Sequence, residues 1–228
     1  MAVWDDIITE RDKQVYEGSG MGGKRAGPGK KPAIVVIDVN YNWVGDKPEP
    51  ILESIKRFPF SCGEEGWKAV NQIASLLPLA REKKVPVIYS TAQERASELE
   101  KGRWLSKSKR SMEAARIDIG TQIVKEIAPM ENDIVIRKTK PSIFFGTPLM
   151  SFLNMIGVDT LFFCGGTTSG CVRASVIDGF SYNFRVSIIE ECTFDRGEVS
   201  HKVNLFDMNA KYGDVVSVAE VKKYLASL

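Results

Sequence analysis

Short runs of β-branched and other apolar residues recur along the chain, and segments with helical periodicity separate most of them. The first run, Pro32–Asp38, stays apolar up to the aspartate, which is typical of a strand buried on both faces of a parallel sheet. Strands that alternate with helices in this way favour one architecture. The sequence therefore predicts an α/β fold with a three-layer, doubly wound (Rossmann-like) parallel sheet.

The predicted elements follow the chain in a regular order. Strands are expected at residues 32–38, 85–91, 133–138, 161–164, 185–190 and 215–218. Helices are expected at 65–83, 119–127, 147–156, from 171 onward, at 199–211 and at 218–228. Pro78 falls inside the first of these helices and should kink it. Prolines favour a loop at 46–65, and the charged segment 92–118 shows no pattern that places it.

The 228 residues suffice for one α/β domain with an arm before it. Residues 1–32 are rich in glycine, with lysine and arginine among them, and predict an extended N-terminal arm that packs on a neighbouring subunit. A phosphate-binding loop is the alternative, but the pattern GxxxxGK[ST] is absent and the segment precedes the first strand. Residues 33–228 form the predicted domain.

The composition excludes several classes of protein. Apolar residues make up 43% and charged residues 26%, as in ordinary soluble globular proteins. A net charge of +2 gives no reason to expect nucleic acid or an anionic membrane surface as a partner. No apolar run reaches the length of a membrane span, and the first residues are too charged for a signal peptide, so we expect a cytoplasmic protein.

The cysteines and the histidine show no spacing that suits a metal site. Cys62, Cys164, Cys171 and Cys192 form no CxxC pair, and His201 is the only histidine. A zinc site would need that histidine together with several cysteines or carboxylates at suitable spacing. We therefore expect no metal and no other cofactor, and a chain this long and apolar is not expected to depend on disulfides.

A strand, a turn of small residues and a helix follow one another in LFFCGGTTSGCVRASVID, residues 161–178. Cys171 falls in the first turn of the expected helix, where free N–H groups and the helix dipole stabilise a thiolate and any oxyanion beside it. Cys171 is therefore a candidate nucleophile. The alternative is a small residue that fills a tight contact between strand and helix, and this stretch alone does not decide between the two.

Two further candidate residues stand at the carboxyl ends of expected strands. Asp38 ends the first strand and Lys138 the third, and ligands bind at that edge of open parallel sheets. Each has a plainer alternative, a turn or helix cap for Asp38 and a solvated side chain for Lys138. If the strands that lead to Asp38, Lys138 and Cys171 are neighbours, the three side chains converge.

An acid, an amine and a thiol at one edge of a sheet can perform nucleophilic catalysis. A carboxylate within reach can take the thiol proton and later protonate a leaving amine. A lysine beside both keeps the carboxylate charged and favours the thiolate. No histidine can serve as the base unless His201 folds back to the site. The N–H groups of the turn Gly166–Gly170 and of Cys171 are candidates for an oxyanion hole.

Three strings of the sequence resemble the signature regions of a known family. They are AIVVIDVN with Asp38, RKTKPSIFFGTPL with Lys138, and CGGTTSGCVRASVIDGF with Cys171. The strings are similar to those of the isochorismatase-like cysteine hydrolases, and the resemblance runs from about Tyr16 to Ser217. Within that superfamily it is greatest to the N-carbamoylsarcosine amidohydrolase branch, through the glycine-rich arm, GTTSGCVRA and HKVNLFDMNAKYGDVVS.

The resemblance implies an amidohydrolase with an Asp38–Lys138–Cys171 triad. Cys171 would attack the carbonyl carbon of a small carboxylated N-carbamoyl compound or amide, ammonia would leave, and water would release the acyl-enzyme. The resemblance also implies a cis peptide between Gly166 and Thr167, an oxyanion hole at Thr167 and Cys171, and a homotetramer whose only other partner is the small-molecule substrate.

Contacts to the substrate are implied as well. By its spacing from Cys171, Arg196 matches an arginine that holds a substrate carboxylate in the family, a task that suits the bidentate fork of a guanidinium. Trp43 matches an aromatic residue of the pocket, and Thr168 is expected to contact the substrate from the turn. Arg173 is the rival of Arg196, but its place inside the nucleophile helix favours a structural role.

The chain departs from part of the family, and some alternatives stay open. The nicotinamidase branch carries a metal site built on histidines that this chain lacks, which argues against nicotinamidase and pyrazinamidase activity. Lys140 competes with Lys138 for the lysine position, and the resemblance to the family, through its spacing before Ser142, implies Lys138. The alternatives are a maleamate-type amidase, an isochorismatase-like vinyl-ether hydrolase and a non-catalytic member of the family.

Overall fold

A computed structural model describes residues 2–22, 24–93, 99, 102–103 and 117–228. A six-stranded sheet lies at its centre in the order β3-β2-β1-β4-β5-β6, and each neighbouring pair is parallel. The strands are β1 (Pro32–Ile37), β2 (Val87–Ala92), β3 (Ile134–Lys138), β4 (Thr160–Gly166), β5 (Arg185–Phe194) and β6 (Asp214–Val216). The chain winds outward from β1 in both directions, which is the doubly wound topology that the alternating pattern predicted.

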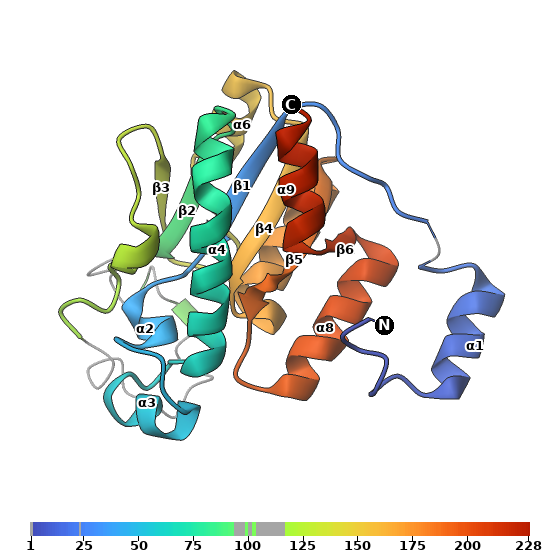
Figure 1. The fold of residues 1–228 in the computed structure, drawn as a ribbon, viewed down its shortest axis with the longest axis horizontal. Coiled ribbons are helices and arrows are strands. Elements are labelled where there is room, and N and C mark those ends of the chain that lie inside the picture. Colours follow the sequence, from blue (N-terminus) through green and yellow to red (C-terminus); the bar gives the residue numbers. More distant parts are fainter. Residues whose placement is uncertain (1, 23, 94–98, 100–101, 104–116) are drawn as a thin grey trace.

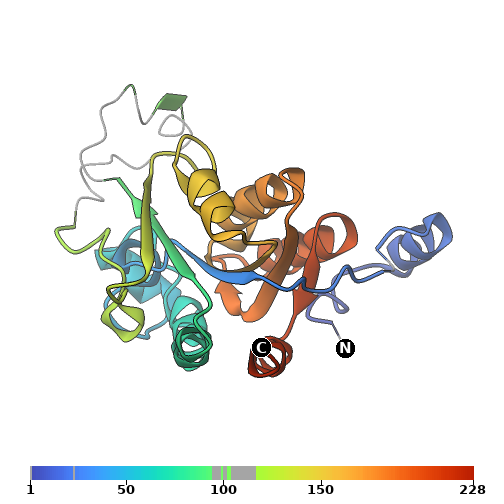
Figure 2. The same ribbon diagram turned by 90° about the horizontal axis from the view of Figure 1, so that it is seen from above.

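Helices cover both faces of the sheet (Figure 1 and Figure 2). One face carries α4 and α9 and the other carries α6, α7 and α8, with bounds α4 (Glu64–Glu82), α6 (Leu149–Ile156), α7 (Arg173–Ser181), α8 (Glu198–Lys211) and α9 (Val218–Ala226). Strand β1 is buried throughout, with Ile34 and Val36 in the core under α4, and Val35 and Ile37 in the core under α7. The three-layer α/β fold is confirmed.

The segment 46–65, predicted as a loop, contains helix α3 (Ile51–Arg57). The prolines of this segment lie at the helix borders, where a missing N–H and a fixed φ are tolerated. Pro50 is the N-cap of α3, and Pro59 follows its end. Helix α4 runs on through Pro78 as one helix.

Other segments also differ from the expected elements. The helix predicted at 119–127 is only a 3-10 turn, Lys125–Ile127. The residues after β1 form a short helix, α2 (Tyr41–Val44). Most of the segment 92–118 lies outside the described residues. Within the described part of the chain, no helix combines the length and the apolar character needed to cross a membrane.

The N-terminal arm, predicted as extended, carries helix α1 (Glu10–Ser19). None of the helix residues is buried, and α1 lies beyond α8, away from the sheet (Figure 1). The Tyr16 ring packs edge-on against Phe206 of α8 at 4.8 Å. Further along the arm, the N–H groups of residues 26 and 27 donate to the Asp214 carboxylate. The arm is therefore tied to both α8 and the β6 edge of the sheet.

Candidate active site

An acid and an amine meet in the interior at the carboxyl edge of the sheet. Asp38 directly follows β1, and its φ of 51° bends the chain there. Asp38 Oδ2 accepts a hydrogen bond of 2.7 Å from Lys138 Nζ at the end of β3. The Asp38 and Lys138 side chains are only 3% and 2% exposed. Little solvent screens an ion pair at this depth, so each charge depends on the other.

This ion pair spans three strands. Strands β1 and β3 are not neighbours, contrary to the condition set from the sequence, because β2 lies between them. The long lysine side chain bridges that distance. Ser90 of β2 donates its hydroxyl to Asp38 Oδ1 at 2.8 Å. Groups from β2 and β3 therefore hold both oxygens of the Asp38 carboxylate.

Cys171 lies where the chain enters the helix after β4. It belongs to a π-helical turn, Thr168–Val172, that continues into α7. The residue is 3% exposed and is part of the core under α7. Asp38 and Lys138 both lie near enough to Cys171 to shift the pKa of its thiol. The structure thus brings together the three side chains that the sequence analysis expected to converge.

Burial dominates the protonation of the thiol. It raises the pKa of Cys171 to about 12, the Asp38 carboxylate adds to the rise, and the Lys138 ammonium opposes it. Burial alone would lower the pKa of Lys138, but the Asp38 carboxylate and Cys171 hold it above its usual value. The resting site at neutral pH therefore holds a thiol beside an ammonium. Deprotonation of Cys171 needs an acceptor, and Asp38 supplies a carboxylate beside it.

The turn before Cys171, residues 165–170, is called here the nucleophile turn, after the candidate nucleophile that follows it. Its peptide between Gly166 and Thr167 is cis, as the resemblance implied. Gly165 has a φ of 100° and approaches the Ile37 main chain so closely that a β-carbon would have no room. The Thr167 carbonyl accepts the N–H of Gly170 at 2.9 Å. Close main-chain contacts and hydrogen bonds thus fix the path of this turn.

Thr168 faces the protein interior. The residue is fully buried. Its hydroxyl oxygen lies 3.1 Å from the Phe194 carbonyl oxygen and 2.8 Å from His201 Nδ1. Burial lowers the pKa of His201, so this imidazole is neutral at pH 7. The structure therefore places His201 against the nucleophile turn as a support for Thr168, and the Thr168 hydroxyl already has protein partners.

Arg196 and Trp43, the residues expected to contact substrate, lie together. The Arg196 guanidinium carbon is 5.0 Å from the centroid of the Trp43 ring. Arg196 Nη2 donates to the Phe60 carbonyl oxygen at 2.6 Å, and the Phe60 ring packs on Trp43 with centroids 5.5 Å apart. Arg196 is exposed, and a guanidinium has five N–H donors, so the bond to Phe60 leaves others for a ligand.

The two rival residues, Arg173 and Lys140, make other contacts. Arg173 Nη1 donates to Asn204 and Asp207 of α8 at 2.5 and 3.3 Å, which is the structural role expected for it. The carbonyl of Lys140 accepts a hydrogen bond of 3.2 Å from Lys138 Nζ. Of the two lysines, Lys138 is therefore the one that pairs with the acid.

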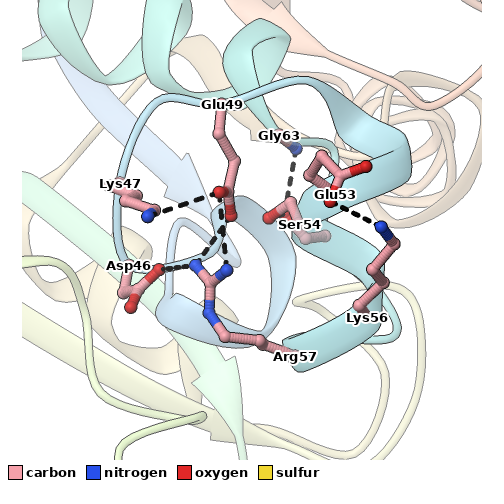
Figure 3. A network of polar contacts seen from close by, with 9 residues as sticks. Asp46, Lys47, Glu49, Glu53, Ser54, Lys56, Arg57 and Gly63 are labelled. Atoms are coloured by element: carbon pink, nitrogen blue, oxygen red, sulfur yellow. Dashed lines mark hydrogen bonds and ion pairs between the residues drawn. The ribbon is translucent and has the colours of Figure 1, made fainter.

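A network of polar contacts holds together the segment between α2 and α4, to which Phe60 belongs (Figure 3). Arg57, at the end of α3, donates to Asp46 at 2.5 Å and to Glu49 at 2.7 Å, so its guanidinium joins the helix to the preceding loop. Hydrogen bonds also link Ser54, Ser61 and Gly63. This hydrogen-bonded segment contains the Phe60 carbonyl, which accepts the hydrogen bond from Arg196.

Three contributors to the site were missed in the sequence. Ser90 could have been found by the argument used for Asp38, since it is a polar residue near the carboxyl end of an apolar strand. Phe60 acts through its carbonyl, which no side-chain pattern reveals. Asp195 binds Ser169 of the nucleophile turn, a contact between loops that are far apart in the sequence.

A cavity of about 450 Å³ lies beside the start of α8. Asp195, Arg196 and His201 are among the residues that line it, whereas Asp38, Lys138 and Cys171 are not. Among the described residues, no group of three or more His, Cys, Asp or Glu side chains is arranged to hold a metal ion.

Replacement of Lys138 by methionine should destabilise the protein by about 3–5 kcal/mol, because it leaves the buried Asp38 carboxylate without its counter-ion. The double variant Lys138→Met with Asp38→Asn should recover most of that loss, since it removes both charges. Urea unfolding at pH 7 measures both. If the double variant were no more stable than the single one, the cost would come from lost packing and not from the unpaired charge.

Comparison with known proteins identifies the family. A profile described as the isochorismatase domain matches residues 32–220. The chain is 35% identical over 211 residues to the N-carbamoylsarcosine amidase of an Arthrobacter species, across 90% of this chain and 75% of that protein. It is 31% identical over 210 residues to the maleamate amidohydrolase of Pseudomonas putida, across 92% of this chain and 93% of that protein.

A solved structure agrees with the fold. The cysteine hydrolase from Pseudomonas syringae pv. phaseolicola superposes with a TM-score of 0.79, at 22% identity, across 90% of this chain and 98% of that one. At this level of identity the match bears on the fold, and the family follows from the profile and the two relatives. The chain therefore belongs to the isochorismatase family and is an amidohydrolase, an enzyme that hydrolyses carbon–nitrogen bonds.

Proposed function

We propose that the protein hydrolyses a small carboxylated N-carbamoyl compound, such as N-carbamoylsarcosine, or a related amide such as maleamate, and releases ammonia through a thioester or thiocarbamate at Cys171. The observation that carries the proposal is the buried group of Asp38, Lys138 and Cys171, in which the acid and the amine are 2.7 Å apart and both perturb the thiol. Maleamate and N-carbamoylsarcosine, named in two relatives, each combine a carboxylate with an amide or carbamoyl carbon.

The first half of the reaction forms the acyl-enzyme. Asp38 takes the proton of the Cys171 thiol while the sulfur attacks the carbonyl carbon, so the raised thiol pKa makes proton transfer part of the attack. The negative charge that develops on the carbonyl oxygen is stabilised by the main-chain N–H groups of Thr167 and Cys171. Protonated Asp38 then gives its proton to the leaving nitrogen, and ammonia departs.

The second half restores the enzyme. Water attacks the acyl carbon and gives a proton to Asp38, the carbon–sulfur bond breaks, and the sulfur takes that proton back as a thiol. A carbamoyl substrate leaves as a carbamic acid, which loses carbon dioxide. Lys138 stays protonated throughout, because the Asp38 carboxylate and Cys171 hold its pKa above the usual value in spite of burial, and its ammonium pairs with the carboxylate that accepts the proton.

Ammonia release across a substrate panel tests this function. The panel contains ureido acids, maleamate, neutral amides of matching length, and isochorismate, whose vinyl ether would be cleaved without ammonia. We expect ammonia from the carboxylated ureido acids or amides at a rate well above that from the neutral amides. Cleavage of isochorismate with no ammonia from any amide would establish a vinyl-ether hydrolase instead, and no turnover of any compound would favour a non-catalytic family member.

Replacement of Arg196 by glutamine should raise KM for carboxylated substrates about 10- to 100-fold, the range expected for a lost hydrogen bond to a charged group. Turnover of a neutral amide should change little, because it has no carboxylate to bind. Arg173→Gln is a matched control, since Arg173 binds α8 and not the ring of Trp43. An equal effect of Arg196→Gln on both kinds of substrate would refute carboxylate binding at Arg196.

A further inference from the structure

The loop between β5 and α8 carries Arg196 and, directly before it, a buried acid. Asp195 is 9% exposed, and its Oδ1 accepts the N–H of Arg196 at 2.7 Å. The guanidinium at the other end of the Arg196 side chain is held by the Phe60 carbonyl and the Trp43 ring. Both the main chain and the charged group of Arg196 are therefore fixed in place.

The second oxygen of the same carboxylate binds the nucleophile turn. Asp195 Oδ2 accepts both the N–H and the hydroxyl of Ser169, at 2.8 and 2.6 Å. Ser169 belongs to the same π-helical turn as Cys171. Hydrogen bonds to an ionised acceptor are the strong kind, and burial makes them costly to lose. One carboxylate thus joins the main chain of Arg196 to the turn that holds the nucleophile.

We propose that Asp195 is a positioning residue that sets the separation between Arg196 and Cys171, and thereby selects substrates by the length between their carboxylate and their scissile carbonyl. The inference rests on the proposed binding of a substrate carboxylate by Arg196. Attack requires the reacting atoms to be about 3–3.5 Å apart, and a misplacement of about 1 Å costs about 100-fold in rate. If the substrate carboxylate is bound by Arg196, a shift of this loop moves the substrate and changes the distance from its carbonyl carbon to the Cys171 sulfur.

The test uses Asp195→Asn in the full-length protein. An asparagine keeps one acceptor oxygen but sets an NH₂ group against either the Arg196 N–H or the Ser169 donors, so one side of the bridge is lost. The substrates are ureido acids that differ by one methylene between the carboxylate and the carbamoyl group. We expect kcat/KM for the best homologue to fall about 10- to 100-fold. The preference among the homologues should flatten, because the shorter or longer ones lose less.

A double-mutant cycle shows whether Asp195 acts through Arg196. The double variant Asp195→Asn with Arg196→Gln should show the same preference for substrate length as Arg196→Gln alone. Ser169→Ala removes only the hydroxyl that donates to Asp195 and keeps the N–H donor. If Asp195→Asn folds poorly, this variant should show the same change in length preference to a smaller extent. Glu198→Gln is the matched control, because Glu198 lines the same cavity and pairs with Lys202, at 2.7 Å. It should keep the wild-type preference.

A uniform loss of kcat/KM across all homologues, with the length preference intact, would overturn the inference and leave Asp195 as a residue of structural stability alone. The inference would also be overturned if the fold-losses in kcat/KM caused by Asp195→Asn and by Arg196→Gln simply multiplied in the double variant. These outcomes differ from failure of the proposed function, in which the wild-type protein itself would release ammonia from none of the ureido acids and the inference would fall with it.

Discussion

Replacement of Asp38 by asparagine should stop ammonia release while making Cys171 easier to alkylate. The loss of turnover should be about 10²–10⁴-fold, the usual contribution of a general acid–base residue. The gain in reactivity follows from charge. The Asp38 carboxylate helps to raise the pKa of the thiol, and the Lys138 ammonium opposes it. Without the carboxylate the pKa of Cys171 falls below about 12, and more thiolate is present at any pH from 7 to 10.

The rate of labelling by iodoacetamide against pH measures this effect. In the wild type the labelling of Cys171 at pH 7 should be slower than that of a free thiol, since a pKa of about 12 leaves little thiolate. Slow labelling is thus no sign of an inactive protein. Ser90→Ala is the control, because it removes the hydrogen bond to Asp38 Oδ1 and keeps the charge. If Asp38→Asn lost turnover with unchanged or slower labelling, a purely structural role for Asp38 would be the better account.

Replacement of Cys171 by alanine should reduce ammonia release by about 10⁴-fold or more, because no other group in the buried triad can form the covalent intermediate. The serine variant should be equally inactive, since a hydroxyl is a far weaker acid than a thiol and a carboxylate is a weak base. Mass spectrometry of wild-type protein quenched during turnover should reveal the acyl group on the peptide that contains Cys171.

Cys192→Ala provides the matched comparison for the nucleophile. Cys192 is also a fully buried thiol, but it lies in β5 beside Cys164 and has no part in the group around Asp38. Its loss should lower stability somewhat, as the removal of a buried side chain does, and should keep turnover. A Cys171→Ala protein with wild-type turnover would end the covalent mechanism.

Much of the sheet was predictable because its strands are continuous apolar runs that end at polar residues. The same pattern placed Asp38, Lys138 and Cys171 at the edge where they are found. The side chains that join separate segments were not predictable. Lys138 reaches Asp38 across β2, and the local periodicity of a sequence reveals neither the strand order nor which side chain a lysine will contact. The hydrogen bond that Ser169 donates to Asp195 likewise joins two segments that are distant in the sequence.

The depth at which Cys171 is buried could not be predicted from the sequence. Its position at a helix start indicated a place where a thiolate is stabilised, but a sequence does not reveal how far a residue lies from solvent. In the structure burial outweighs the Lys138 ammonium, and the pKa of Cys171 rises. Helix α3 was missed because Pro50 and Pro59 suggested a loop, although prolines at the two borders of a helix are compatible with it.

The three strands that supply Asp38, Ser90 and Lys138 link the chemistry to the pairing of the sheet. Successive side chains of a strand point to opposite faces, so a slip of β2 or β3 by a single residue would carry Ser90 or Lys138 away from Asp38 and bury apolar residues wrongly. In a misregistered chain Asp38, Ser90 and Lys138 would therefore not meet. Recovery of activity during refolding should consequently track the last strand to dock, and not the earlier appearance of helical circular dichroism.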